Sequence, residues 1–174
     1  MGWKSVKEAY DIDHIVQVDD QGLRIGTGYI SDLLCVSKDG AITVNSVVGE
    51  SSPEITRIRN EMEADPQRLL RLMRAEDRFD ESLTVWTYED GRILELECEE
   101  YGWPNVTHDG RLMYENMFFD RKEQAVKAAV RNCESAVSGW KDIVAKSEES
   151  LAKERLHLAN VEANLQAYRS QARA

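Results

Sequence analysis

The 174-residue sequence contains few prolines, cysteines, histidines and phenylalanines, three of each, and no apolar run of about 18 residues, the length a transmembrane helix needs. Its opening residues also lack the apolar core of a signal peptide. The cysteines, Cys35, Cys98 and Cys133, form no CxxC pair. Neither a disulfide framework nor a zinc knuckle is therefore indicated, and we expect a protein of a reducing cytoplasm.

Motifs of enzyme active sites are absent as well. The sequence has no GxSxG elbow and no phosphate-binding glycine loop before a helix. His14 follows Asp11 and Asp13, and His108 precedes Asp109, so a metal site would require these two regions to converge in the fold. A metal-dependent enzyme using the His14 and His108 regions is one alternative hypothesis. The sequence supplies no further ligand, and we predict no catalytic residue, no resident metal and no cofactor.

Negative charge is in excess and unevenly distributed. The chain has 32 acidic and 22 basic residues. Residues 1–119 hold 24 and 12 of these, a net charge of −12, whereas residues 120–174 hold 8 and 10, a net charge of +2. The excess is steepest in residues 76–100, with ten acidic and two basic residues. Such a body repels nucleic acids and anionic membranes and attracts basic protein surfaces.

Short apolar runs between turn residues predict a small α+β body over residues 1–119. Ser5 and Glu8 have the spacing of a capping box, which favours a helical turn at residues 6–10. Asp39-Gly40 is typical of a hairpin turn, and the short runs favour an antiparallel meander or a small barrel. The predicted strands are His14–Val18, Leu23–Gly26, Tyr29–Val36 and Ala41–Val47.

A helical pair is predicted next, over about residues 54–64 and 66–75. Ser52-Pro53 has the residues of a helix start, and Asp65-Pro66 interrupts the helical pattern because proline disfavours a helical residue before it.

A second hairpin is predicted from Leu83–Tyr88 and Arg92–Glu99. In its second strand Leu94, Leu96 and Cys98 alternate with Glu95, Glu97 and Glu99, which puts the glutamates on the face away from the core. Carboxylates two strand rises apart are separated by about 6.6–6.8 Å, which resembles phosphate spacing. The glutamates are therefore either a decoy for a nucleic-acid-binding groove or a solvated face. The candidate partner-binding residues are Glu89, Asp90, Glu95, Glu97, Glu99 and Glu100.

Residues 120–174 predict one long coiled-coil helix, with Asp120 and Glu123 at its start. From Val126 to Tyr168, in alternating steps of four and three, eleven of thirteen positions are apolar, and only Ser147 and Glu154 are polar. A 3.5-residue repeat requires a packing partner, either a second copy or, through a bend at Gly139, the rest of the chain. The candidate oligomerisation residues are Val126, Val130, Val137, Trp140, Val144, Leu151, Leu158, Val161, Leu165 and Tyr168.

Two stretches, WKSVKEAYDIDHIVQV (Trp3–Val18) and GWPNVTHDGRLMYEN (Gly102–Asn116), resemble small uncharacterised proteins of tailed bacteriophages. The resemblance implies a phage origin and expression in the host cytoplasm, and it supplies no functional residues. Small acidic phage proteins outside the virion are often inhibitors of host defence, such as CRISPR inhibitors.

These observations favour a non-enzymatic interaction protein. In the first hypothesis its acidic body blocks a basic surface of a host protein, such as one of a defence system. Its helix forms a homo-oligomer, and it has no direct nucleic-acid or membrane partner. In the alternative it is a coiled-coil assembly or scaffold protein without an inhibitory role.

Overall fold

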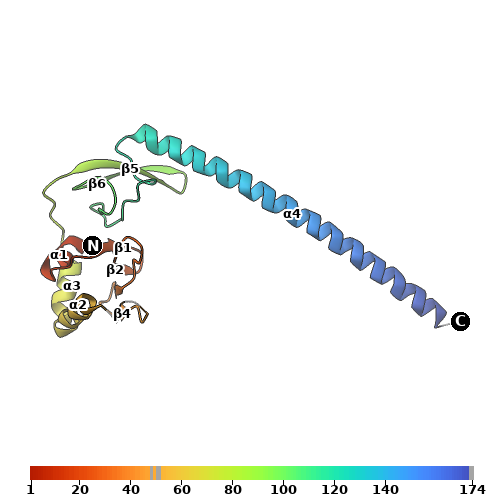
Figure 1. The fold of residues 1–174 in the computed structure, drawn as a ribbon, viewed down its shortest axis with the longest axis horizontal. Helices are drawn as coiled ribbons and strands as arrows, with labels where there is room; N and C mark the ends of the chain where they lie inside the picture. Colours follow the sequence, from red (N-terminus) through yellow and green to blue (C-terminus); the bar gives the residue numbers. More distant parts are fainter. Residues whose placement is uncertain (48, 50–51, 173–174) are drawn as a thin grey trace. The chain divides into compact units, whose positions relative to one another are not determined.

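The computed structural model describes residues 1–47, 49 and 52–172 and confirms the predicted α+β class (Figure 1). Chain contacts divide it into two compact units, Met1–Ala128 and Ala129–Ala174. The elements are α1 (Trp3–Ala9), β1 (Ile15–Val18), β2 (Gly22–Gly26), β3 (Leu34–Ser37), β4 (Ile42–Val44), α2 (Pro53–Ala64), α3 (Pro66–Met73), β5 (Leu83–Glu89), β6 (Arg92–Cys98) and α4 (Lys122–Gln171).

The first four strands form an antiparallel meander in the order β1-β2-β3-β4, one of the two arrangements the sequence allowed. The prediction of a strand over Tyr29–Val36 was wrong in its first half, because β3 begins only at Leu34. Thr27 Oγ1 accepts hydrogen bonds from the backbone N–H groups of Tyr29 and Ile30, at 3.2 and 3.0 Å. This side chain closes a turn that local apolar character did not reveal.

The predicted helical pair is confirmed, with both starts as expected. Ser52 Oγ accepts from the N–H of Ile55 at the start of α2, and Asp65 Oδ1 accepts from the N–H of Arg68 at the start of α3. These caps use neighbours three residues away, which is why the sequence revealed them.

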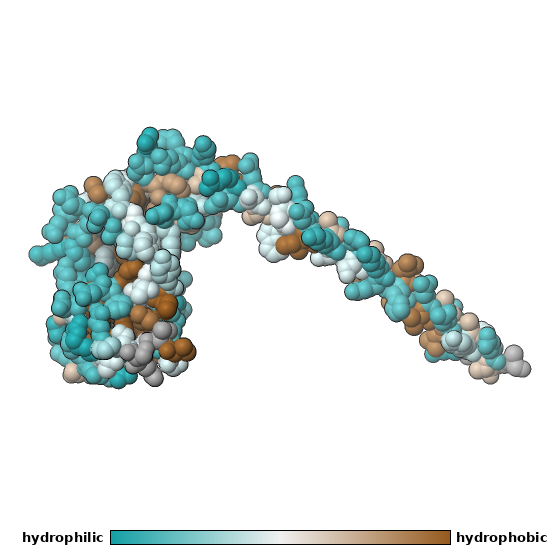
Figure 2. All heavy atoms as spheres, viewed as in Figure 1, coloured by the Kyte–Doolittle hydropathy of each residue, from teal (hydrophilic) through white to brown (hydrophobic). Residues whose placement is uncertain are grey.

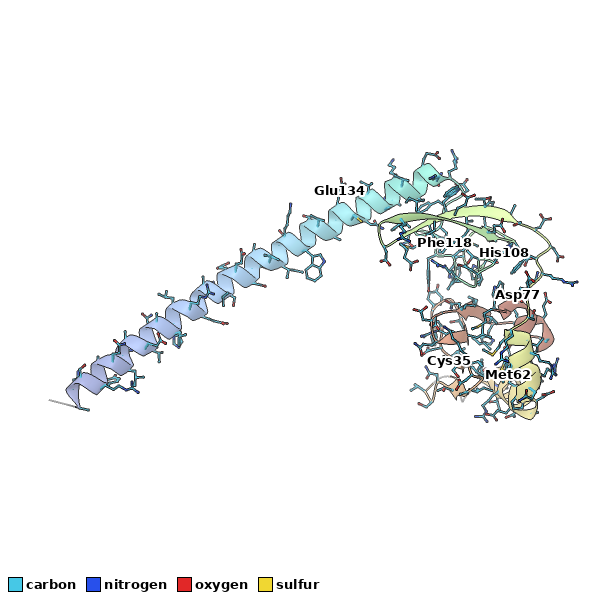
Figure 3. The ribbon with its side chains drawn as sticks, turned by 180° about the vertical axis from the view of Figure 1, so that it is seen from behind. Cys35, Met62, Asp77, His108, Phe118 and Glu134 are labelled. Carbon is cyan, nitrogen blue, oxygen red and sulfur yellow. The ribbon has the colours of Figure 1, made fainter. Side chains whose placement is uncertain are left out.

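The predicted capping box of α1 was wrong. The helix begins at Trp3, before Ser5, and its free N–H groups are satisfied from a distant segment. The carboxylate of Asp77 accepts hydrogen bonds from the backbone N–H groups of Lys4 and Ser5, at 3.1 and 2.8 Å, and from the Ser5 hydroxyl. Asp77 is labelled in Figure 3. A negative charge at a helix N-terminus also interacts favourably with the helix dipole.

Two apolar cores lie within the first unit. The larger is shared by α1, α2, α3 and the meander and includes Tyr10, Leu23, Ile25, Ile55 and Met62. The smaller lies against the hairpin of β5 and β6, where Val85, Cys98 and Met113 are buried with Leu83, Leu96 and Phe118 around them. The hairpin therefore has an apolar face and a solvated face, as its alternating sequence predicts.

A loop at residues 105–113 is bonded to both sheets. The N–H of His108 donates to the carbonyl of Glu97 at 2.7 Å, extending the edge of β6. Two residues later the carbonyl of Gly110 accepts from the N–H of Val18 at 2.8 Å, at the end of β1. The carbonyl of His108 also accepts from the indole N–H of Trp3 at 3.0 Å. The loop thus fixes the hairpin to the meander.

We expect Gly110→Ala to destabilise the protein more than Gly91→Ala. Both glycines have positive φ, +94° and +75°, so both alanines cost about 1–2 kcal/mol of backbone strain. Only at Gly110 would the new Cβ meet another residue, 2.2 Å from Val18 Cγ2. Urea unfolding should show that Gly110→Ala loses a further amount of about 1–3 kcal/mol in the free energy of unfolding, the cost of overpacking. Equal losses in the two variants would contradict the tight contact between the loop and β1.

Candidate functional site

The predicted oligomerisation residues all lie exposed on α4. The sequence predicted one uninterrupted helix there, and α4 is a single helix of 50 residues. Its described residues include only two buried ones, Ala125 and Ala128. The ten candidate side chains are 40–68% exposed, from Val126 to Tyr168, and Figure 2 shows hydrophobic residues recurring along this helix among hydrophilic ones. The result is a long stripe of exposed apolar side chains along α4.

On the hairpin, Glu95 and Glu97 lie on the face opposite the small core. They pair across the strands with Trp86 and Thr84, and both are exposed. Glu99 follows the last residue of β6 and is only half-exposed. The three glutamates therefore do not form the uniform row that strict alternation suggested.

Three of the six candidate acidic residues have a basic side chain of the chain itself beside them. Glu89 lies 2.9 Å from Arg111, Glu97 lies 3.5 Å from His108 Nδ1, and Glu99 lies 2.6 Å from Lys4 Nζ. The other three are exposed, and no hydrogen bond or ion pair joins their side chains to another residue in the part of the chain that the structure describes. These three are Asp90, Glu95 and Glu100.

The pair formed by Lys4 and Glu99 is the best-sheltered of these contacts, with side chains 15% and 30% exposed. Burial alone would raise the pKa of Glu99. The hydrogen bonds from Lys4 and from the N–H of Asp80, together with the positive charge of Lys4, outweigh burial and lower that pKa. Glu99 thus has a structural role beside α1.

The two histidine regions have separate surroundings. His14 Nδ1 lies 3.0 Å from Glu54 Oε2. The His108 ring instead stacks on the ring of Phe79, with 3.7 Å between the ring centroids and 5° between the ring planes. Among residues 1–47, 49 and 52–172, no group of three or more His, Cys, Asp and Glu side chains is placed to hold a metal ion. The arrangement supplies no ligand set for the metal hypothesis.

The cysteines differ in their surroundings. Burial raises the pKa of the Cys98 and Cys35 thiols, so neither is a ready nucleophile. Cys133 is exposed on the α4 stripe.

An aromatic surface on the first unit was not predicted from the sequence. Tyr29, Trp103 and Tyr114 line one hollow of about 580 Å³ together with Gly28, Glu115 and Asn116. The predicted strand over Tyr29–Val36 did not reveal it, because that prediction placed Tyr29 in a sheet and not in a loop. The signal that was available is the turn chemistry of Gly26-Thr27-Gly28, which places the following tyrosine in a loop.

We expect Glu99→Gln to lower the free energy of unfolding by about 1–2 kcal/mol at pH 7, because it weakens a charge-assisted hydrogen bond. Since folding lowers the pKa of Glu99, its contribution is complete above the ordinary carboxyl value of 4.5. It is lost as the pH falls through the lower folded value. The difference in the free energy of unfolding between the wild type and Glu99→Gln, measured with urea, should therefore shrink below about pH 4.5.

Glu95→Gln is the matched control, since Glu95 is on the same hairpin and exposed. It should change stability by no more than about 0.5 kcal/mol. A Glu99→Gln protein as stable as the Glu95→Gln protein at pH 7 would contradict a structural role for Glu99.

No helix within the described residues is both long enough and apolar enough to cross a membrane. Comparison of the chain with protein-family models, with curated proteins and with solved structures yields no match. The surfaces of the molecule itself are therefore the guide to its function.

Proposed function

We propose that this protein is a non-enzymatic interaction protein that self-associates through α4 and displays its acidic body from the assembly. The observation that carries the proposal is the apolar stripe of α4, exposed from Val126 to Tyr168. At 1.5 Å per residue this stripe is about 63 Å long. An exposed apolar surface of that length normally marks an interaction site.

The partner that best matches this stripe is the same stripe on a second copy of the chain. The apolar positions keep a 3.5-residue spacing, which matches a helix with the same repeat. The helix passes through Gly139 without a break, so the structure has no hairpin there. The segment of residues 120–174 has a net charge of only +2, so two copies would repel each other little.

The order of side chains around the stripe favours antiparallel helices. In heptad notation, one set of core positions (a) holds only Val and Leu, whereas the other (d) contains Trp140, Ser147 and Glu154. Parallel helices would place Glu154 against Glu154 and Trp140 against Trp140. Antiparallel helices pack a against d, so each of these residues meets Val or Leu from the partner.

The flanking charges favour the same orientation. The residues that directly follow the d positions, called e, alternate between positive and negative charge from Lys127 to Arg169. Between them, the residues that directly precede the a positions, called g, carry no acidic or strongly basic side chain. Parallel helices bring e beside g, whereas antiparallel helices bring e beside e, where alternating signs allow opposite charges to meet. Such flanking charges set helix orientation in coiled coils. The e positions are Lys127, Glu134, Lys141, Glu148, Arg155, Glu162 and Arg169.

We expect Leu158→Asp to dissociate the assembly and Leu156→Asp to leave it intact. The two leucines are two residues apart and similarly exposed, 57% and 66%, but only Leu158 belongs to the stripe. Leu156 lies on the opposite side of the helix, so its substitution controls for added charge and helix propensity. Sedimentation velocity at tens of micromolar should show an oligomer for the wild type and Leu156→Asp, and a monomer for Leu158→Asp. A monomeric wild type would refute self-association.

Helix orientation can be measured with one spin label per chain. The label is placed at Ser135→Cys, on the outer face of α4, in a Cys35→Ser and Cys133→Ser background. Antiparallel helices separate the two labels by about 40–50 Å, since position 135 lies well away from the middle of the stripe. Parallel helices place them about 25 Å apart, from the helix spacing and the two side chains. A short distance in an intact oligomer would refute the antiparallel arrangement without affecting self-association.

A second candidate function is capture of a partner protein with a basic surface. The observation that favours it is the set of carboxylates without a partner in the described chain, Asp90, Glu95 and Glu100, on a body of net charge −12. The resemblance to phage proteins would make this partner a host protein, and inhibition of a defence system such as CRISPR stays a prediction. Because Glu89, Glu97 and Glu99 have internal partners, these three predicted carboxylates fit this role less well than Glu95.

A further inference from the structure

The aromatic hollow on the first unit presents three large rings to solvent. Tyr29 is 91% exposed, and its ring centroid lies 5.9 Å from that of Trp103 with an interplanar angle of 58°. Tyr114 lines the same hollow, as do Glu115 and Asn116. The rings are therefore tilted around an open space and flanked by a carboxylate and an amide.

The backbone around the hollow is well fixed. The indole of Trp103 lies directly against Gly28, where a Cβ would come within 2.2 Å of Trp103 Cζ2. The Thr27 hydroxyl holds the turn that carries Tyr29. On the other side, the carbonyl of Tyr114 accepts hydrogen bonds from the N–H groups of Met117 and Phe118. Two segments distant in sequence, residues 28–29 and 103–116, thus converge on one site.

We propose that this hollow binds a cationic side chain, Arg or Lys, of a partner protein. The faces of aromatic rings carry negative electrostatic potential and attract ammonium and guanidinium groups. Glu115 adds a full negative charge to the same site, and no Lys or Arg lines it. The net charge of −12 over residues 1–119 attracts the same class of partner. The site deepens the second candidate function and rests on it.

The lining also argues against two other ligands. Aromatic platforms for nucleic acid combine stacking rings with a positively charged groove, and this site has a carboxylate in an acidic body. A purely apolar partner segment would leave Glu115 and Asn116 against apolar groups at a desolvation cost. A cation satisfies the rings and the carboxylate together.

The experiment uses the full chain labelled with 5-fluorotryptophan. The protein has four tryptophans, and the Trp103→Phe variant identifies the resonance of Trp103 in the fluorine NMR spectrum. The probes are N-acetyl-arginine methylamide and N-acetyl-lysine methylamide, with neutral N-acetyl-norleucine methylamide as the control of similar shape. We expect the two cationic probes to shift the Trp103 resonance in a saturable manner and the neutral probe to leave it unchanged.

Variants locate the binding. Tyr29→Ala should weaken binding about 2- to 5-fold, the value of a cation–π contact at an exposed site, and Tyr29→Phe should retain it. Glu115→Gln should weaken it by a similar factor. Tyr101→Ala is the matched control, because Tyr101 is also exposed but does not line the hollow. Binding by Tyr101→Ala should equal that of the wild type.

Four results would overturn the proposal. The first is an equal response to the neutral probe, which would indicate a general apolar surface. The second is the absence of a Trp103 response to the cationic probes. The third is loss of the response in a Glu95→Gln and Glu100→Gln variant, which would assign the cation to the acidic hairpin. That third result would leave the second candidate function, capture of a partner with a basic surface, intact. Failure of the aromatic hollow can therefore be distinguished from failure of that function. Tetramethylammonium serves as a further probe. A Trp103 response to this probe alone would assign the site to small quaternary amines and would also overturn the proposal.

Discussion

The first unit depends on the loop at residues 105–113, because this loop is hydrogen-bonded to both sheets. The N–H of His108 extends the edge of β6, and the carbonyl of Gly110 caps the end of β1. Thr107, at the centre of the loop, is fully buried. Its hydroxyl accepts from the N–H of Arg111 and bonds to Asp109, so the buried polar group is satisfied locally. Two small sheets with separate cores are held as one body in this way.

The same constraint shapes the surface. The segment that carries Trp103 leads into this loop, and Tyr114 follows it, so fixing the loop also fixes two of the three rings of the aromatic hollow. Lys4 and Arg111 place their positive charges beside Glu99 and Glu89 and so reduce the charge of the hairpin. The packing of the body thereby decides where negative charge stays available to a partner and where it is neutralised.

The second unit follows a different physical principle. In the first unit apolar side chains are buried by the chain itself, whereas on α4 they recur at a spacing that a single straight helix leaves in solvent. Core positions that contain Ser147 and Glu154 give less stability than apolar ones, but they restrict which partner positions can face them. In the proposed assembly these two positions would therefore lower the affinity between helices while restricting their orientation.

The sequence by itself determined the elements whose signals are local. The caps of α2 and α3 at Ser52 and Asp65 and the alternation of β6 involve neighbours two or three residues away, and the repeat of α4 extends the same short spacing. Only the tertiary structure decided the contacts across long separations in the chain. Asp77 caps α1 from 72 and 73 residues away, and Lys4 neutralises Glu99 from 95 residues away. The physical reason is that periodicity records which face of an element is apolar, whereas the partner of each charged or aromatic group is set by how distant segments pack.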